Sequence, residues 1–233
     1  NDTSSGFPVT SVQAYQHKLY VTVNNIHGNN PGTFFILDIT DPSQTPGFIG
    51  GLDNNPNVGQ GLNSVAVDGN NYAYMANAYG ANFETCNNNG GTNLGCGQMQ
   101  VIDISNPTSP SVQYTFQVPG VTGKSGQSIG QSIFYKDGIV YLGLAKNPGS
   151  GEPEFNVIDV GGGGIPGASP TNPKILGNGF SVGNGVNAIY VRDGYAYIAT
   201  PNNEELKVLD VSNPGAGINQ IGGYNAPDNQ GNG

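Results

Sequence analysis

The sequence repeats one pattern of short β-strand signals four times, and this repetition constrains the fold more than any other feature. Each copy opens with a strand of alternating residues, and a short turn then leads to a second strand that carries a tyrosine. The aligned tyrosines, spaced by 54, 67 and 56 residues, are Tyr20, Tyr74, Tyr141 and Tyr197. Self-similarity at a period of this size is typical of propellers and repeat arrays. We expect these tyrosines to pack in the core or between repeats.

The turn between the first two strands has a recognisable chemistry in each copy. Three of the four turns contain Asp-Gly, at Asp68-Gly69, Asp137-Gly138 and Asp193-Gly194. Asp-Gly favours the two-residue turn of a β-hairpin, because both residues tolerate a positive φ. In the first copy the turn is formed by Gln16-His17-Lys18. The pattern therefore predicts antiparallel pairing of the first two strands.

A third strand in each copy ends in an aliphatic-Asp-aliphatic signature. The four aspartates are Asp38, Asp103, Asp159 and Asp210. An aspartate at a strand end accepts hydrogen bonds from the backbone N–H groups of the following turn, so a structural role is favoured over a ring of functional carboxylates. A turn and a fourth strand follow, and in the third copy this connection is lengthened through Gly161 to Pro173.

Four antiparallel strands per copy indicate an all-β protein, and no apolar period of 3.6 residues of useful length predicts a helix. Four strands in each of four copies correspond to a β-propeller with four four-stranded blades. A β-sandwich could hold sixteen strands, but it has no reason to repeat its sequence. The whole chain, 1–233, is expected to form one propeller domain with units at about 9–56, 57–122, 128–180 and 184–228.

One segment resembles a known repeat, the LVIVD repeat. It is Gly97-Gln98-Met99-Gln100-Val101-Ile102-Asp103-Ile104-Ser105-Asn106-Pro107. Matching positions occur in all four units, so the resemblance covers roughly residues 9–228. It implies a propeller-like protein that is secreted or displayed on a bacterial or archaeal surface. It implies no shared catalytic residue.

The ends of the repeat array leave two explanations open. Each unit supplies its own four strands, and the sequence stops where a fifth unit would begin. Either four blades close without strand exchange, or these residues belong to a longer propeller or a larger protein. Unpaired strand edges recruit other chains. We therefore also expect pairing with further sequence of the same protein or with a neighbouring subunit.

The charge balance excludes several partners. The chain has 7 Lys and Arg against 16 Asp and Glu, for a net charge of −9. Nucleic-acid binding requires cations that neutralise phosphates, and anionic membrane surfaces are disfavoured for the same reason. No run of 18 apolar residues predicts a membrane span. Charged residues make up only 10% of the chain, so Asn, Gln, Ser and Thr must cover much of the surface, which suits an extracellular or cell-surface protein.

The two cysteines support the same location. Cys86 and Cys96 are separated by nine residues rich in Asn and Gly, a loop that a disulfide could close easily. We predict that they are joined in an oxidising compartment. Two reduced thiols in a cytosolic loop are the alternative.

The longest segments of the repeats are the connections from second to third strands and the links between blades, which lie on one face of a propeller. Long loops in compact domains carry function more often than short ones. We expect this face to be the binding surface; the alternative is that its long loops have no function. Its candidate residues are His27, Asp53, Asn55, Tyr79, Phe83, Glu84, Glu152, Glu154 and Glu204.

A cofactor and an activity are less well indicated. Asp53, Asn55 and Asn57 offer oxygen atoms suited to calcium, but Pro56 and the lack of a downstream Glu depart from an EF-hand loop. No nucleophile motif occurs, and Trp, a common sugar platform, is absent. We therefore expect a non-catalytic extracellular module, adhesin-like or structural, that binds a protein or glycan on a surface. The alternative is a secreted glycan-acting hydrolase that uses two loop carboxylates.

Overall fold

The computed structural model describes residues 8–23, 33–52, 61–78, 97–120, 129–145, 152–201 and 204–227. These residues form sixteen β-strands in four four-stranded sheets, and they contain no helix. Within these ranges there is accordingly no helix of the length and apolarity that a membrane crossing needs. The predicted all-β fold with four antiparallel units is confirmed.

Each sheet, here called a blade, consists of four strands that are consecutive in the chain. Blade 1 contains β1 (Val9–Tyr15), β2 (Lys18–Val23), β3 (Phe34–Asp38) and β4 (Gly47–Leu52). Blade 2 contains β5 (Gly61–Val67), β6 (Tyr72–Ala78), β7 (Met99–Asp103) and β8 (Ser111–Phe116). Blade 3 contains β9 (Gly130–Lys136), β10 (Ile139–Leu144), β11 (Phe155–Asp159) and β12 (Lys174–Ile175). Blade 4 contains β13 (Ala188–Arg192), β14 (Tyr195–Ala199), β15 (Leu206–Asp210) and β16 (Asn219–Tyr224).

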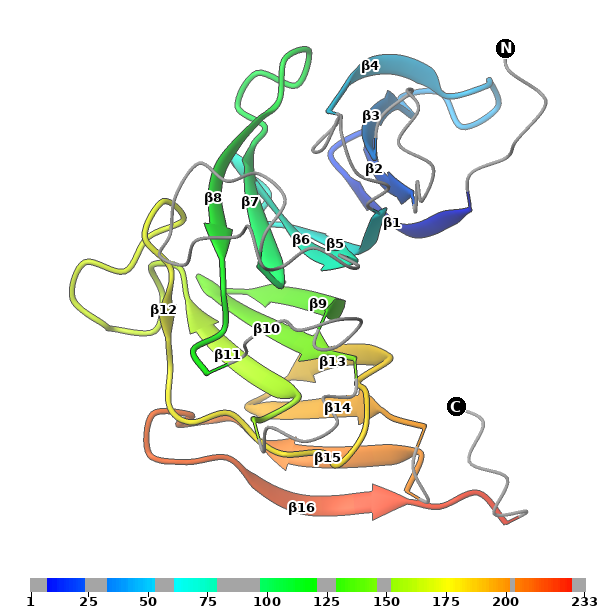
Figure 1. The fold of residues 1–233 in the computed structure, drawn as a ribbon. Helices are drawn as coiled ribbons and strands as arrows, with labels where there is room; N and C mark the ends of the chain where they lie inside the picture. The colour runs from blue at the N-terminus through cyan, green and yellow to red at the C-terminus, as the bar shows by residue number, and fades with distance from the viewer. Residues whose placement is uncertain are drawn as a thin grey trace.

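The blades follow one another along an arc, from blade 1 in blue to blade 4 in orange and red (Figure 1). The first strands of the blades lie innermost, with β1 against β5, β5 against β9, and β9 against β13. Each blade keeps its own four strands, so none of the described strands is exchanged between the first and last blades. Blade 4 does not pack on blade 1 in the described part of the chain, and the arc is therefore open at its two ends.

The hairpins between first and second strands follow the predicted turn chemistry in two of the three Asp-Gly copies. Asp137 and Gly138 have φ values of 51° and 79°, and Asp193 and Gly194 have φ values of 53° and 80°. Positive φ at both central residues is the mark of a type I′ hairpin turn. These two-residue turns place the strands in the right-handed twist of the sheet.

Blade 2 has a longer connection between its first two strands. There β5 ends at Val67 and β6 begins at Tyr72, so the turn consists of the four residues Asp68-Gly69-Asn70-Asn71. Oδ1 of Asp68 accepts hydrogen bonds from the backbone N–H groups of Asn70, Asn71 and Tyr72, at 2.8, 3.0 and 3.0 Å. The aspartate side chain thus organises a wider turn than its dipeptide suggests.

The aspartate that ends each third strand accepts hydrogen bonds from the next turn, as predicted. Asp38, Asp103 and Asp210 each accept the backbone N–H group two residues on, at 2.8 to 2.9 Å. Hydrogen bonds from Thr40 and Ser212 lower the pKa values of Asp38 and Asp210. These carboxylates hold the strand-to-turn geometry.

Asp159 of blade 3 anchors a longer connection. Burial raises the pKa of Asp159, but hydrogen bonds from backbone N–H groups of the following turn, chiefly those of Gly163, Gly161 and Ile165, outweigh it and leave the pKa below its ordinary value. Three of these bonds, from Gly161, Gly163 and Ile165, measure 2.8 Å. One buried carboxylate therefore organises the glycine-rich turn before β12.

The core lies in three layers between consecutive blades. We call the side of a blade that meets the next blade its forward face, and the opposite side its rear face. The forward faces of blades 1, 2 and 3 centre on Tyr20 with Phe34, Tyr74 with Met99, and Tyr141 with Phe155. The rear faces of blades 2, 3 and 4 centre on Val65 with Ile102, Ile133 with Ile158, and Val191 with Leu209.

A glycine in the outer part of blades 1 and 3 lets the next blade approach. A Cβ atom on Gly50 would overlap the carbonyl oxygen of Pro107, and one on Gly177 would overlap that of Pro214. Both prolines lie in the turn after the third strand of the following blade. The same pairing of a glycine with a proline-containing turn thus closes the interfaces between blades 1 and 2 and between blades 3 and 4.

Candidate functional site

The two faces of the propeller differ in the connections that they carry. The hairpins between first and second strands and the turns between third and fourth strands share one face, the turn face. The connections from second to third strands and the links between blades attach at the other, the loop face. Most of the predicted site lies outside the described residues: His27, Asp53, Asn55, Asn57, Tyr79, Phe83, Glu84, Cys86 and Cys96. The predicted disulfide and calcium site therefore stay predictions.

Glu154 is described, and it is buried at the loop face. It directly precedes β11, and its Oε2 atom accepts the backbone N–H groups of Val182 and Gly183 at 2.8 and 3.2 Å. The hydroxyl of Ser181 donates to the same oxygen at 3.4 Å. The carboxylate therefore fixes the link that leads from blade 3 to blade 4.

Two other blades use the same position in the same way. Gln98 directly precedes β7, and its Oε1 atom accepts the backbone N–H of Val118 at 2.8 Å. Glu205 directly precedes β15, and its Oε2 atom accepts the backbone N–H of Ala226 at 2.8 Å. In each case a side-chain oxygen before the third strand holds the segment that leaves the blade. This position is a repeated structural device, and aligning the repeats one residue ahead of the third strand would have revealed it.

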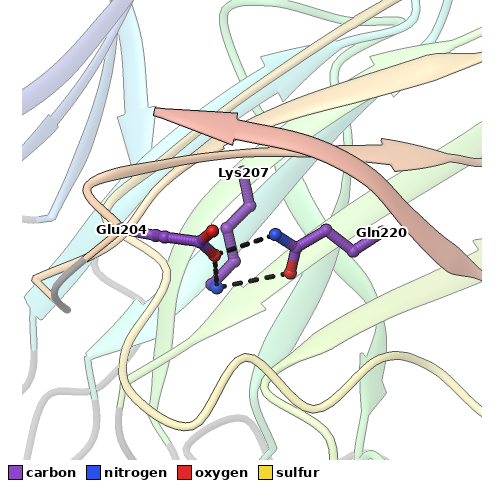
Figure 2. A network of polar contacts seen from close by, with 3 residues as sticks. All are labelled: Glu204, Lys207 and Gln220. Atoms are coloured by element: carbon purple, nitrogen blue, oxygen red, sulfur yellow. Dashed lines mark hydrogen bonds and ion pairs between the residues drawn. The ribbon is translucent and has the colours of Figure 1, made fainter. Parts of the chain in front are cut away.

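Glu204 lies beside this device but has different partners (Figure 2). Its Oε2 atom forms an ion pair of 2.5 Å with Nζ of Lys207, and it accepts a hydrogen bond of 2.8 Å from Nε2 of Gln220. Nζ of Lys207 also donates to Oε1 of Gln220 at 3.3 Å. Hydrogen bonds from Lys207 and Gln220, together with the charge of Lys207, lower the pKa of Glu204. The carboxylate is thus held ionised and tied to β15 and β16.

Glu152 also lies at the loop face, against the end of the described segment that follows blade 2. A Cβ atom on Gly120 would lie 2.5 Å from its Oε1 atom, so the carboxylate covers that glycine. Glu152 and Glu154 belong to blade 3, whereas Glu204 belongs to blade 4 and has its own partners. The structure thus places all three predicted carboxylates on the expected face, but it does not assemble them into one acid–base pair.

The hollows lined by described residues include two that the sequence did not predict. One, of about 240 Å³, lies along the inner strands and is lined by Gln13 of β1, Ser64 of β5 and Tyr135 of β9. The other, of about 280 Å³, lies at the turn face between blades 3 and 4, with Tyr141 and Ser212 in its wall. The first could have been anticipated, because the first strands of propeller blades surround the axis.

The polar groups of the inner hollow are already engaged. Oε1 of Gln13 accepts the backbone N–H of Val67 at 2.9 Å, which ties β1 to β5. The hydroxyl oxygen of Tyr135 accepts the backbone N–H of Gly138 at 3.0 Å, and its ring stacks on Tyr74. Across the described ranges, no three His, Cys, Asp or Glu side chains gather into a group that could hold a metal ion.

The fold and the strand contacts define a β-propeller with four blades. The sequence model of the LVIVD repeat matches residues 96–118 in blade 2 and 185–220 in blade 4. Two stretches of the chain thus match the LVIVD repeat within a four-bladed propeller fold, as the resemblance implied. Comparison with curated proteins gave no significant match.

Solved structures of the same fold come from designed and natural proteins. The computationally designed Ika4 protein is 13% identical, with 94% of this chain and 95% of that chain covered at a TM-score of 0.51. The designed Ika8 protein is 12% identical, with 94% and 48% covered at 0.50. An auxiliary nutrient binding protein from Bacteroides thetaiotaomicron is 10% identical, with 93% and 42% covered at 0.51. This chain therefore spans nearly all of Ika4 but less than half of the other two. At these identities the likeness concerns the fold alone.

Proposed function

We propose that this protein is a non-catalytic interaction module that acts outside the cell, as an adhesin-like or structural surface protein. Its ligand is a protein or a glycan on a surface, and binding uses the loop face. The net charge of −9 disfavours anionic partners. The Bacteroides neighbour, an auxiliary nutrient binding protein, supports a binding role for a fold of this kind.

One observation carries the non-catalytic part of the proposal. The carboxylate of Glu154 accepts backbone N–H groups in a position that Gln98 and Glu205 use in the same way. The carboxylate of Glu204 is neutralised by Lys207. A hydrolytic pair needs one carboxyl group free to give a proton and another free to attack or to activate water. These two side chains serve the architecture instead.

The test of the binding face compares loop-face substitutions with one on the turn face. Tyr79→Ala and Phe83→Ala should each weaken binding in a glycan array and in a screen of surface proteins. His17→Ala, in the exposed hairpin of blade 1, is the matched control and should bind like the parent. Equal binding by all three variants would place the ligand elsewhere.

The catalytic alternative is tested on a panel of chromogenic glycosides. Glu152→Gln is the sharper substitution, because replacing the buried Glu154 would also disturb the link between blades 3 and 4. We expect no turnover by the parent protein. Turnover that Glu152→Gln abolishes while the circular dichroism spectrum is unchanged would establish a hydrolase.

The proposed location has its own test. In an oxidising compartment Cys86 and Cys96 are expected to be joined. Mass spectrometry of the natural protein, prepared without reductant and with free thiols blocked at once, should find neither cysteine alkylated. Two alkylated cysteines would contradict the proposed location.

A further inference from the structure

The exposed apolar surface of the described residues is concentrated at the two ends of the arc. Of the ten large hydrophobic side chains that are exposed, nine lie on the rear face of blade 1 or the forward face of blade 4. The first group is Val9, Val12 and Phe48. The second is Tyr190, Tyr195, Tyr197, Leu206, Ile221 and Tyr224. Patches of this kind on a soluble protein mark interaction sites.

The forward face of blade 4 has the residues of a blade interface but no blade against it. Tyr197 is 38% exposed, whereas its equivalents Tyr20, Tyr74 and Tyr141 are 5%, 1% and 7% exposed. The prediction that all four tyrosines are packed is therefore wrong for Tyr197. Its repeat position is the same, but no described blade packs against it.

Neighbouring positions on this face repeat the contrast. Leu206, the first residue of β15, is 37% exposed, while the first residues of β3, β7 and β11 are fully buried. Tyr224 pairs with Leu206 across the sheet, as Phe116 pairs with Met99 in blade 2. Phe116 is buried, whereas Tyr224 is exposed. The whole face, rather than a single residue, is uncovered.

The rear face of blade 1 is the complementary surface. Val12 is exposed, while its equivalents Val65 and Ile133 are buried in the interfaces that precede blades 2 and 3. Phe48 pairs with Leu37 across the sheet and is 69% exposed. In blade 2, Val112 holds the equivalent place opposite Ile102 and packs against blade 1.

The contact between glycine and the proline-containing turn is also unmatched at the two ends. Gly222 lies opposite Val208 as Gly50 lies opposite Ile36, so Gly222 holds in blade 4 the place of Gly50 in blade 1. A Cβ atom on Gly222 would meet only the side chain of Val208, at 3.7 Å. The turn of blade 1 that would fill such a place contains Pro42, which is exposed.

We propose that a second copy of this chain occupies these faces, with the forward face of blade 4 in one copy against the rear face of blade 1 in the other. Every interface between described blades joins a forward face to a rear face. Each copy retains one uncovered rear face, on blade 1, and one uncovered forward face, on blade 4. A head-to-tail contact of this kind is heterologous, and it leaves no free face when the copies close into a ring.

Two features favour a second copy as the occupant. The two faces lie at opposite ends of the arc and do not meet within one chain (Figure 1). An arc of this fold also makes up about half of a longer solved chain, since 94% of this chain covers 48% of Ika8. A second copy would supply both missing faces at once.

The experiment measures the mass of the 233-residue chain by light scattering after size exclusion, across a concentration series. The parent should reach a closed assembly of more than one 24.0 kDa chain, and two copies would form the smallest ring. Tyr197→Asp on the forward face and Val12→Asp on the rear face should each raise the dissociation constant roughly a hundredfold or more, because a carboxylate would have to be desolvated. Tyr15→Asp is the control, because Tyr15 is equally exposed but lies outside both faces.

Mixing the two disrupted variants separates head-to-tail contact from other geometries. The intact forward face of Val12→Asp can meet the intact rear face of Tyr197→Asp, so the mixture should associate where each variant alone does not. A parent that stays monomeric at every concentration would overturn the proposal. It would equally be overturned if Tyr197→Asp or Val12→Asp assembled like the parent, or if the mixture failed to regain association.

Discussion

Blades 3 and 4 present the same repeat positions to different surroundings. Phe155 in blade 3 and Leu206 in blade 4 both begin the third strand, yet the first is fully buried and the second is 37% exposed. Tyr141 and Tyr197 differ in the same sense. The difference arises from the blade that follows, since blade 4 covers blade 3, whereas no described blade covers the forward face of blade 4. Burial in a propeller is therefore a property of the pair of blades rather than of the repeat.

The largest expected effect tests this comparison directly. Phe155→Ala should lower the free energy of unfolding by about 3–5 kcal/mol, because it opens a cavity between blades 3 and 4. Leu206→Ala, at the equivalent position, should cost less than about 1 kcal/mol in the dilute single chain, because no packed neighbour is lost. Urea unfolding followed by tyrosine fluorescence measures both. Equal losses would show that blade 4 is covered in solution.

A glycine pair sharpens the comparison at the outer strands. Gly50→Ala should cost about 1–3 kcal/mol, because its Cβ would overlap the backbone of Pro107 in blade 2. Gly222→Ala, at the same repeat position in blade 4, meets only Val208 and should change stability by less than about 0.5 kcal/mol. The same urea titration in dilute protein applies. A costly Gly222→Ala would mean that a turn already fills this place.

The third test uses the aspartates that end β11 and β15. The pKa of Asp159 is held below its ordinary value of 3.8, so its carboxylate stabilises the folded state above that pH. This contribution is lost as the pH falls through the lower folded-state value. Asp159→Asn should thus reduce the melting temperature most at neutral pH, and the gap to the parent should close as the pH falls through the lowered folded-state pKa of Asp159.

Asp210→Asn is the matched substitution in blade 4. Asp210 accepts one backbone N–H group and the hydroxyl of Ser212, whereas Asp159 accepts three backbone N–H groups. The pH-dependent gap in melting temperature should therefore be smaller for Asp210→Asn. A gap that stays constant with pH for either variant would rule out this titration as its source.

The smallest effect is expected from the ion pair of Glu204 and Lys207 in blade 4, whose side chains are 44% and 12% exposed. Glu204→Gln should lower the melting temperature only slightly, because the Glu204 carboxylate is open to solvent and an ion pair to such a group stabilises little. The amide of the variant can still hydrogen-bond Gln220. Repeating the thermal scan in 0.5 M salt should reduce the difference between variant and parent, and a salt-independent loss would indicate a structural role beyond the charge.

Much of this fold could be predicted because each repeat contains residues that specify its turns. The Asp-Gly dipeptides at Asp137 and Asp193 specify hairpins through backbone conformation alone, and the terminal aspartates specify turns through local hydrogen bonds. Interactions of this kind are complete within a few residues. Asp68 differs from these two aspartates. Its side chain accepts a hydrogen bond from the backbone N–H group of Tyr72 and so stabilises a wider turn than the Asp-Gly dipeptide alone would form.

The site was less predictable, because its chemistry depends on contacts between distant segments. Glu154 looks like a loop carboxylate in the sequence, and only the approach of Val182 shows that it is a structural acceptor. The exposure of Tyr197 likewise depends on a surface that lies outside its own blade. Side chains with local partners were assigned correctly, and Tyr20, Tyr74 and Tyr141 pack as predicted, whereas the surroundings of Glu154 and Tyr197 depend on segments that the repeat pattern does not specify.

The linear order of the blades, in which each contacts only its neighbours, has a thermodynamic consequence. Blades 2 and 3 each have two neighbours, but blades 1 and 4 each have one, so stability along the chain follows a nearest-neighbour model with two weak ends. Opening can begin at either end and break a single interface, whereas an inner blade must break two. Joining the ends would remove both starting points, so ring closure would change the cooperativity of unfolding as well as the size of the assembly.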